Sequence, residues 1–167
     1  MATATIVPVS EYLNTTWRPD CEYVDGEVRE RNMGETDHSR LQMLLSSYLF
    51  KQEARWGIIG LPEQRVQVKA SRFRVPDITV VAGLLPTTPI LLVPPFLCIE
   101  ILSRGDSMYD MQDRIDDYLS FGVPNVWVVN PGTRRAFAYT PDGMREARDG
   151  VLRTQNPDIE LPLSALE

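Results

Sequence analysis

The chain alternates between segments with helical hydrophobic spacing and short apolar runs of strand length. Residues 36–57 carry leucines and a tyrosine three or four positions apart, which predicts a helix of about five turns that Gly57 closes. Residues 106–121 repeat this spacing and predict a second long helix, which Pro124 prevents from continuing. A shorter helix is predicted to begin near Ser10.

Strands are predicted where β-prone residues run between turn signals. Asp25-Gly26 lies between two such arms and predicts a hairpin, because both turn positions need a positive φ. The run 96–102 is apolar on both faces, which is typical of a central strand covered on each side. Further strands are expected at 58–61, 64–70, 76–82, 125–131 and 134–140, and a weak one near 151–152 that completes a meander.

This order of elements predicts the fold class. It indicates a single α/β domain over residues 1–167, with a mixed central β-sheet flanked by α-helices and an N-terminal β-hairpin. No internal repeat or linker interrupts the pattern.

Two acidic residues stand where apolar residues are expected. Glu100 interrupts the strand "FLCIEIL", and Asp77 opens the strand "PDITVV". If these strands are neighbours, two carboxylates meet at one edge of a sheet and repel each other unless they share a cation. Mg²⁺ (or Mn²⁺) takes oxygen ligands and is often held by one or two carboxylates. The pair therefore predicts a metal site.

Each acid also has an alternative interpretation. Glu100 could form a salt bridge with a core arginine, although carboxylates are seldom fully buried, which favours the functional interpretation. Asp77 could cap a turn, since Pro-Asp is a common turn pair, and the sequence alone leaves its two interpretations even.

Composition and charge narrow the choice of function. The net charge of −6 argues against a protein that coats nucleic acid through many cationic contacts. His38 is the one histidine, and Cys21 and Cys98 form neither a disulfide framework nor a zinc motif. The N-terminus lacks a secretory signal, and prolines and a glutamate interrupt the most apolar stretch, so we expect no membrane span and a cytoplasmic location.

The motifs "VPDITVV", "CIEILS", "RIDDY" and "GVPNVWVVNP" resemble the Uma-type family of endonuclease-like proteins. This family is part of the restriction-endonuclease-like PD-(D/E)XK superfamily. "EYVDGEV" and the histidine of "TDHSRL" also match the family, so the resemblance covers roughly residues 10–140. It implies a Mg²⁺-dependent phosphodiesterase site acting on DNA, and a homodimer.

The resemblance assigns roles residue by residue. Asp77 and Glu100 match the two metal-binding acids. Glu27 matches an acidic position that could contact the metal or its water, and His38 matches a position near the same cleft. Local sequence alone favours simpler interpretations: Glu27 as an exposed strand residue, and His38 as a residue that faces solvent or bonds a neighbour.

The resemblance also exposes a departure. The superfamily's lysine usually stands where this chain has Leu102; in the Uma-type pattern it lies on the following helix, where this chain has Arg114. Arginine stays charged and cannot act as a base, but it can clamp a phosphate. The alternative is a helix-surface ion pair of Arg114 with Asp110 or Asp117.

A basic stretch precedes Asp77. "RVQVKASRFR" predicts a hairpin whose cations could form a substrate-binding patch beside the metal. The alternative is a solvated hairpin tip. These cations are Arg65, Lys69, Arg72 and Arg74.

Two functions remain open from the sequence. The first is a Mg²⁺-dependent endonuclease in which a metal-activated water attacks a phosphodiester bond of DNA. The second is a catalytically weak or inactive nuclease-like module that binds nucleic acid or a protein partner. Arg114 and the acidic net charge favour the second, whereas the two strand carboxylates favour the first.

Overall fold

The computed structural model describes residues 5–32 and 34–167. The helix α1 spans Val9–Asn14, α2 spans Thr36–Trp56 and α3 spans Met108–Phe121. Gly57 ends α2 in the left-handed conformation, with φ +63°, and Ser107 caps α3 by accepting a hydrogen bond from the backbone N–H of Asp110. The two long helices predicted from hydrophobic spacing are therefore confirmed.

The central sheet is mixed and six-stranded, as the alternation of strands and helices predicts. The strands lie in the order β10-β9-β8-β7-β6-β3, and only β7 and β8 are parallel neighbours within it. Their bounds are β3 Ile58–Pro62, β6 Ile78–Ala82, β7 Leu97–Ile101, β8 Asn125–Val129, β9 Ala136–Thr140 and β10 Gly143–Glu146.

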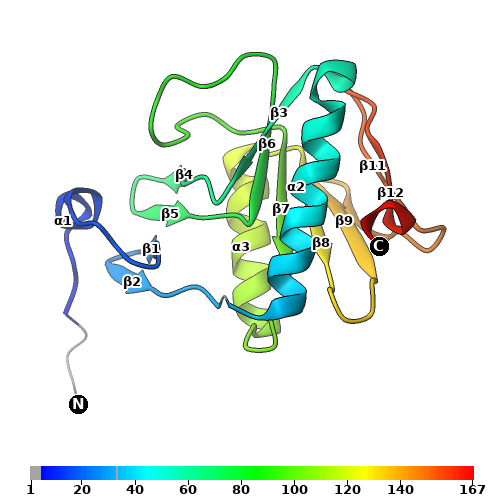
Figure 1. The fold of residues 1–167 in the computed structure, drawn as a ribbon. Helices are drawn as coiled ribbons and strands as arrows, with labels where there is room; N and C mark the ends of the chain where they lie inside the picture. Colours follow the sequence, from blue (N-terminus) through cyan, green and yellow to red (C-terminus); the bar gives the residue numbers. More distant parts are fainter. Residues whose placement is uncertain (1–4, 33) are drawn as a thin grey trace.

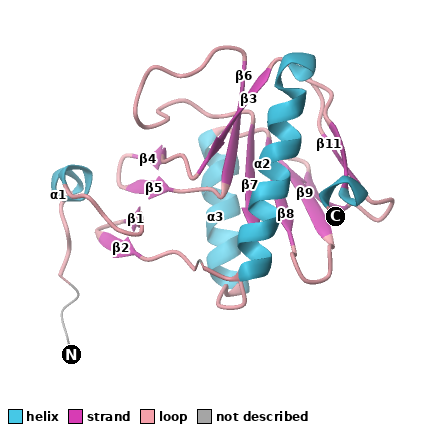
Figure 2. Ribbon diagram, in the orientation of Figure 1, coloured by secondary structure: helices cyan, strands magenta, loops and turns pink. Residues whose placement is uncertain are grey.

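The two long helices cover opposite faces of this sheet (Figure 1; Figure 2). Leu41, Leu45 and Leu49 of α2 pack on one face, against residues such as Ile99. The apolar side of α3 packs on the other face, against Cys98 and Val126. Because successive strand residues point to opposite faces, the apolar run of β7 supplies both cores.

A second sheet, which the sequence does not predict, adjoins α3. The Asp-Gly hairpin pairs with the basic hairpin in the strand order β2-β1-β5-β4, so the single sheet predicted from the sequence is a central sheet with a smaller companion. β1 is an interior strand of this small sheet and β2 is an edge strand. The bounds are β1 Glu22–Val24, β2 Glu27–Arg29, β4 Val66–Lys69 and β5 Arg72–Arg74.

The predicted C-terminal meander is wrong. β9 and β10 form a hairpin, but β11 (Val151–Arg153) pairs with β12 (Glu160–Pro162) in a separate two-stranded sheet. β11 and β12, with the 3₁₀ helix η1 (Leu163–Leu166), pack instead onto the core on the α2 face. Burial of Leu152 and Leu161 outweighs pairing with β10.

The beginnings of α2 and α3 lie close together at one end of the central sheet, together with the loop 102–107 that follows β7 (Figure 1). Cys21 and Cys98 are both buried free thiols. Among the described residues, no helix combines the length and the hydropathy that a membrane span requires.

Candidate active site

Asp77 and Glu100 stand opposite each other on neighbouring strands. β6 and β7 are antiparallel with Ile78 opposite Ile99, so one step further along this register Asp77 lies opposite Glu100. Both side chains are buried, with 4% of each residue exposed. The backbone N–H of Ile101 donates to Asp77 Oδ2 at 2.7 Å, which holds the aspartate at the sheet end. The strand neighbourhood on which the metal prediction depended is therefore present.

The other oxygen of Asp77 meets the side chains of an arginine and a histidine. Arg31 Nη2 donates to Oδ1 at 3.0 Å, and His38 Nε2 lies 3.3 Å from the same atom. The hydrogen bond to Asp77 raises the pKa of His38, although burial acts in the opposite direction. His38 is buried, so it bonds a neighbour and does not face solvent.

Glu100 has a different environment. Its Oε1 accepts a hydrogen bond of 2.6 Å from the hydroxyl of Tyr118, a residue of α3 that is also part of the core. Burial, followed by the negative charge of Asp77, raises the pKa of Glu100 to about 8. The alternative that Glu100 is salt-bridged to a core arginine is not borne out, because no arginine nitrogen among the described residues lies within ion-pair distance of it.

Arg114 faces the protein interior. Its Nε lies 3.3 Å from Glu22 Oε2 and its Nη1 lies 3.7 Å from Asp106 Oδ1, and only 13% of its side chain is exposed. Burial disfavours the charged guanidinium, but the carboxylates of Glu100 and Glu22 outweigh burial and raise the pKa of Arg114. Arg114 is therefore a fixed cation beside the carboxylate pair.

The surface ion pair considered for Arg114 is wrong. The carboxylate of Asp110 accepts a hydrogen bond from the Ser107 hydroxyl at the start of α3. Asp117 is buried and pairs with the arginines of the basic hairpin.

Glu22 is a site residue that the sequence does not single out. It is 2% exposed; its Oε1 accepts the backbone N–H of Val75 at 3.1 Å, and its Oε2 contacts both Arg114 and Arg74. Glu22 reaches this position because β1 pairs with β5, and no local sequence pattern predicts that pairing.

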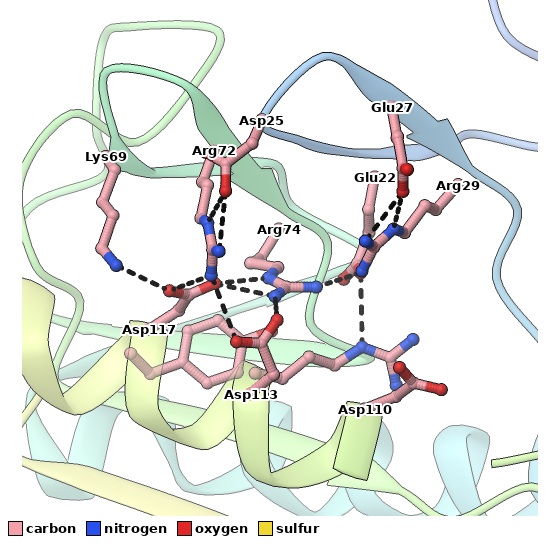
Figure 3. A network of polar contacts seen from close by, with 12 residues as sticks. Glu22, Asp25, Glu27, Arg29, Lys69, Arg72, Arg74, Asp110, Asp113 and Asp117 are labelled. Atoms are coloured by element: carbon pink, nitrogen blue, oxygen red, sulfur yellow. Dashed lines mark hydrogen bonds and ion pairs between the residues drawn. The ribbon is translucent and has the colours of Figure 1, made fainter. Parts of the chain in front are cut away.

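The structure does not bring Glu27 to the carboxylate pair. Glu27 lies on the edge strand β2, has 54% of its side chain exposed and pairs with Arg29 at 2.8 Å (Figure 3). A direct contact of Glu27 with a metal bound at Asp77 has no support in this geometry. The buried glutamate of this hairpin is Glu22, on β1.

The cations of the basic hairpin are matched by carboxylates of the chain itself (Figure 3). Arg74 is buried and pairs with Glu22, Asp113 and Asp117. Arg72 pairs with Asp25 and with the same two aspartates of α3. Arg65 pairs with Asp20, and Lys69 lies 3.4 Å from Asp117 with half of its side chain exposed. The hairpin docks the small sheet onto α3, and every nitrogen of the Arg74 guanidinium is hydrogen-bonded to a carboxylate of the chain.

The donor set suits one divalent cation bound through few protein ligands. Among the described residues no group of three or more histidine, cysteine, aspartate or glutamate side chains forms a metal cluster. Mg²⁺ needs only one or two carboxylates, with water and substrate oxygens completing its shell. Burial and, after it, the negative charge of Asp77 raise the pKa of Glu100, and a bound cation would offset the repulsion between the two carboxylates.

The comparison with solved structures defines the class of fold. The chain is similar to a putative nuclease belonging to DUF820 from Anabaena variabilis ATCC 29413, with a TM-score of 0.80, 22% identity, and coverage of 95% of this chain and 97% of that chain. Over 75% of its length it also matches 10% of a chain in the DrdV–DNA complex, with a TM-score of 0.42 and 16% identity. The fold is thus that of the restriction-endonuclease-like nucleases.

The family model Uma2, described as "Putative restriction endonuclease", matches residues 9–167. The chain therefore belongs to the Uma2 family, and the resemblance found in its motifs is confirmed. The comparison with curated proteins gave no match.

Proposed function

We propose that this protein is a nuclease that uses Mg²⁺ or Mn²⁺ to hydrolyse phosphodiester bonds in DNA. The observation that carries the proposal is the buried pair of Asp77 and Glu100, opposite each other in register at the sheet end. Membership of the Uma2 family supports the reaction class. The homodimer and the cytoplasmic location belong to the same proposal as expectations.

Asp77 and Glu100 would hold the cation. When bound, such an ion lowers the pKa of a water molecule and neutralises charge that develops on a phosphoryl oxygen. Asp77 is oriented for this role by the backbone N–H of Ile101 and by His38. Tyr118 orients Glu100 from the opposite side of the pair, through a short hydrogen bond.

Arg114 would bind the phosphate and stabilise the charge of the transition state. Glu22 and Asp106 position its guanidinium, which remains protonated and cannot remove a proton from water. His38 is the neighbouring side chain that can carry a proton, because it lies against Asp77 and its pKa is raised.

The alternative is a nuclease-like module that binds DNA without cutting it. Two points favour it: the resemblance matches Arg114 to the family's lysine, and Asp77 Oδ1 already contacts both Arg31 and His38. A metal at Asp77 would have to compete with these two side chains for that oxygen.

The test is metal-dependent cleavage of supercoiled and single-stranded DNA by the wild type, Asp77→Ala, Glu100→Ala and Arg114→Lys. We expect nicking with Mg²⁺ or Mn²⁺ that both alanine variants lose, and Arg114→Lys to cut as well as the wild type or better. Cleavage that persists in Glu100→Ala would overturn the proposal. If no variant cuts, Arg114→Lys included, and the protein still binds DNA, the binding module is the correct function.

A further inference from the structure

Arg31 has a donor that the protein does not use. Its side chain is 7% exposed, and its Nη2 is bonded to Asp77. Its Nη1 lies 3.8 Å from Glu63 Oε1, beyond hydrogen-bond distance, and has no hydrogen-bond partner in the part of the chain that the structure describes. Buried polar groups almost always have such a partner, so an unused buried donor next to a site is informative.

The chain fixes Arg31 in this position from several sides. Asn32, the next residue, donates to Asp106 Oδ1 at 3.0 Å, and its carbonyl accepts the hydroxyl of Ser103. Glu35 accepts the backbone N–H of Arg104 in the same loop. The segment around Arg31 is therefore tied to the β7–α3 loop, which carries Asp106, one of the two carboxylates beside Arg114.

Each of the two arginines lies near two carboxylates: Glu22 and Asp106 for Arg114, and Asp77 and Glu63 for Arg31. Arg31 differs in that its buried Nη1 has no hydrogen-bond partner among the described residues. A guanidinium presents five N–H donors in a planar fork, which can bind one oxyanion along one edge and another along the next. The unused part of that fork suits an anion with several acceptor oxygens beside Asp77.

We propose that Arg31 is a substrate-binding residue that donates from Nη1 to a backbone phosphate of bound DNA while Nη2 stays on Asp77. This inference rests on the proposed function, because it takes DNA as the ligand. The phosphate contact is therefore assigned to a residue beside the carboxylate pair. It is not assigned to the basic hairpin, whose arginines pair with aspartates of α3. Arg31 and Arg114 then both contact the DNA.

A purely structural role for Arg31 makes a different prediction. If Arg31 only offsets the charge of Asp77, its loss weakens DNA binding by exposing that carboxylate, and removing the carboxylate as well restores binding. The test therefore uses an Asp77→Asn background, in which cleavage and this repulsion are both absent.

The experiment measures binding of a short fluorescein-labelled DNA duplex by anisotropy, in EDTA and over a series of salt concentrations. The variants are Asp77→Asn alone and with Arg31→Ala, Arg31→Lys or Arg55→Ala. Arg55 is exposed in the last turn of α2, at the opposite end of that helix, so its loss removes the same charge away from the site. Thermal melts establish that each variant is folded.

We expect Arg31→Ala to weaken binding about tenfold and to lower the salt slope by about one, the effect of one lost phosphate contact. Arg55→Ala should change binding less than about twofold, and Arg31→Lys should retain the slope at intermediate affinity. Equal binding by the Arg31→Ala and Arg55→Ala variants, or no binding by Asp77→Asn itself, overturns the inference. Since no cleavage is measured, a wild type that binds but does not cut contradicts only the nuclease proposal.

Discussion

Glu22 and Arg114 meet across the boundary between the small sheet and α3, with 3.3 Å between Glu22 Oε2 and Arg114 Nε. The N-terminal hairpin thus holds Arg114 in its position. Because Glu22 also accepts the backbone N–H of Val75, two residues before Asp77, one carboxylate links the hairpin, the strand that carries Asp77 and α3.

Glu22→Gln should destabilise the protein and weaken DNA cleavage. The amide can still accept the N–H of Val75, but Arg74 and Arg114 lose a buried counter-charge, which we expect to cost about 2–3 kcal/mol of unfolding free energy. Urea denaturation followed by circular dichroism measures the loss. Glu27→Gln is the matched control, since an exposed ion pair contributes about 0–1 kcal/mol. Equal losses in the two variants would contradict the role given to Glu22.

Glu100→Gln should stabilise the metal-free protein and abolish its response to Mn²⁺. Burial and the negative charge of Asp77 both disfavour a carboxylate at position 100. Glutamine removes this cost and its carbonyl can still accept the Tyr118 hydroxyl, so we expect a gain of about 2 kcal/mol. Thermal melts with and without Mn²⁺ test both effects. A saturating ion should raise the wild-type melting temperature. A ligand at about a hundred times its dissociation constant adds about 2.7 kcal/mol to the free energy of unfolding. A variant that still responds to Mn²⁺ would place the ion elsewhere.

We expect acid to weaken the ion pairs between the small sheet and α3. Hydrogen bonds from Arg72 and Ser71 lower the pKa of Asp25 to about 2. Burial alone would raise the pKa of Asp113, but hydrogen bonds from Arg74 and Arg72 overcome burial and lower it. Groups with a lowered pKa stabilise the fold fully above their unfolded pKa, about 4, and lose that contribution as the pH falls through the folded value.

The measurement is the free energy of unfolding between about pH 5 and pH 2. We expect it to fall across this window, and to fall less steeply in Asp25→Asn. The effect of Asp25 alone should be modest, because half of its side chain is exposed and solvent screens its pairing. An identical slope in the variant and the wild type would mean that the Arg72–Asp25 pair does not contribute.

Gly122→Ala should lower stability more than Gly150→Ala. Both glycines have a positive φ, +108° and +77°, which strains any other residue. A Cβ on Gly122 would also lie 3.2 Å from Pro94 Cγ, whereas nothing lies within 4 Å of a Cβ on Gly150. We expect losses of about 2 and about 1 kcal/mol, measured by urea denaturation. Equal losses would show that the loop carrying Pro94 moves away from the added Cβ without lowering the free energy of unfolding.

Sequence reasoning succeeded where the deciding interactions are local. The apolar stripes of α2 and α3, the glycine that ends α2 and the Asp-Gly turn all depend on residues within about one helical turn of one another. Glu100 was also found locally, because a carboxylate in an apolar strand is conspicuous wherever the strand lies.

Tertiary structure decided which charges belong to the site. Arg74 and Arg114 look alike in the sequence, yet one docks a sheet onto α3 and the other lies beside Glu100, because strand pairing gives each its partners. Glu22 lies on an interior strand and is buried, whereas Glu27 lies on an edge strand and is exposed. Arg31 meets Asp77 across 46 positions of the chain. Hydrophobic period determines elements locally, whereas electrostatic partners depend on contacts between residues distant in sequence, which no local pattern encodes.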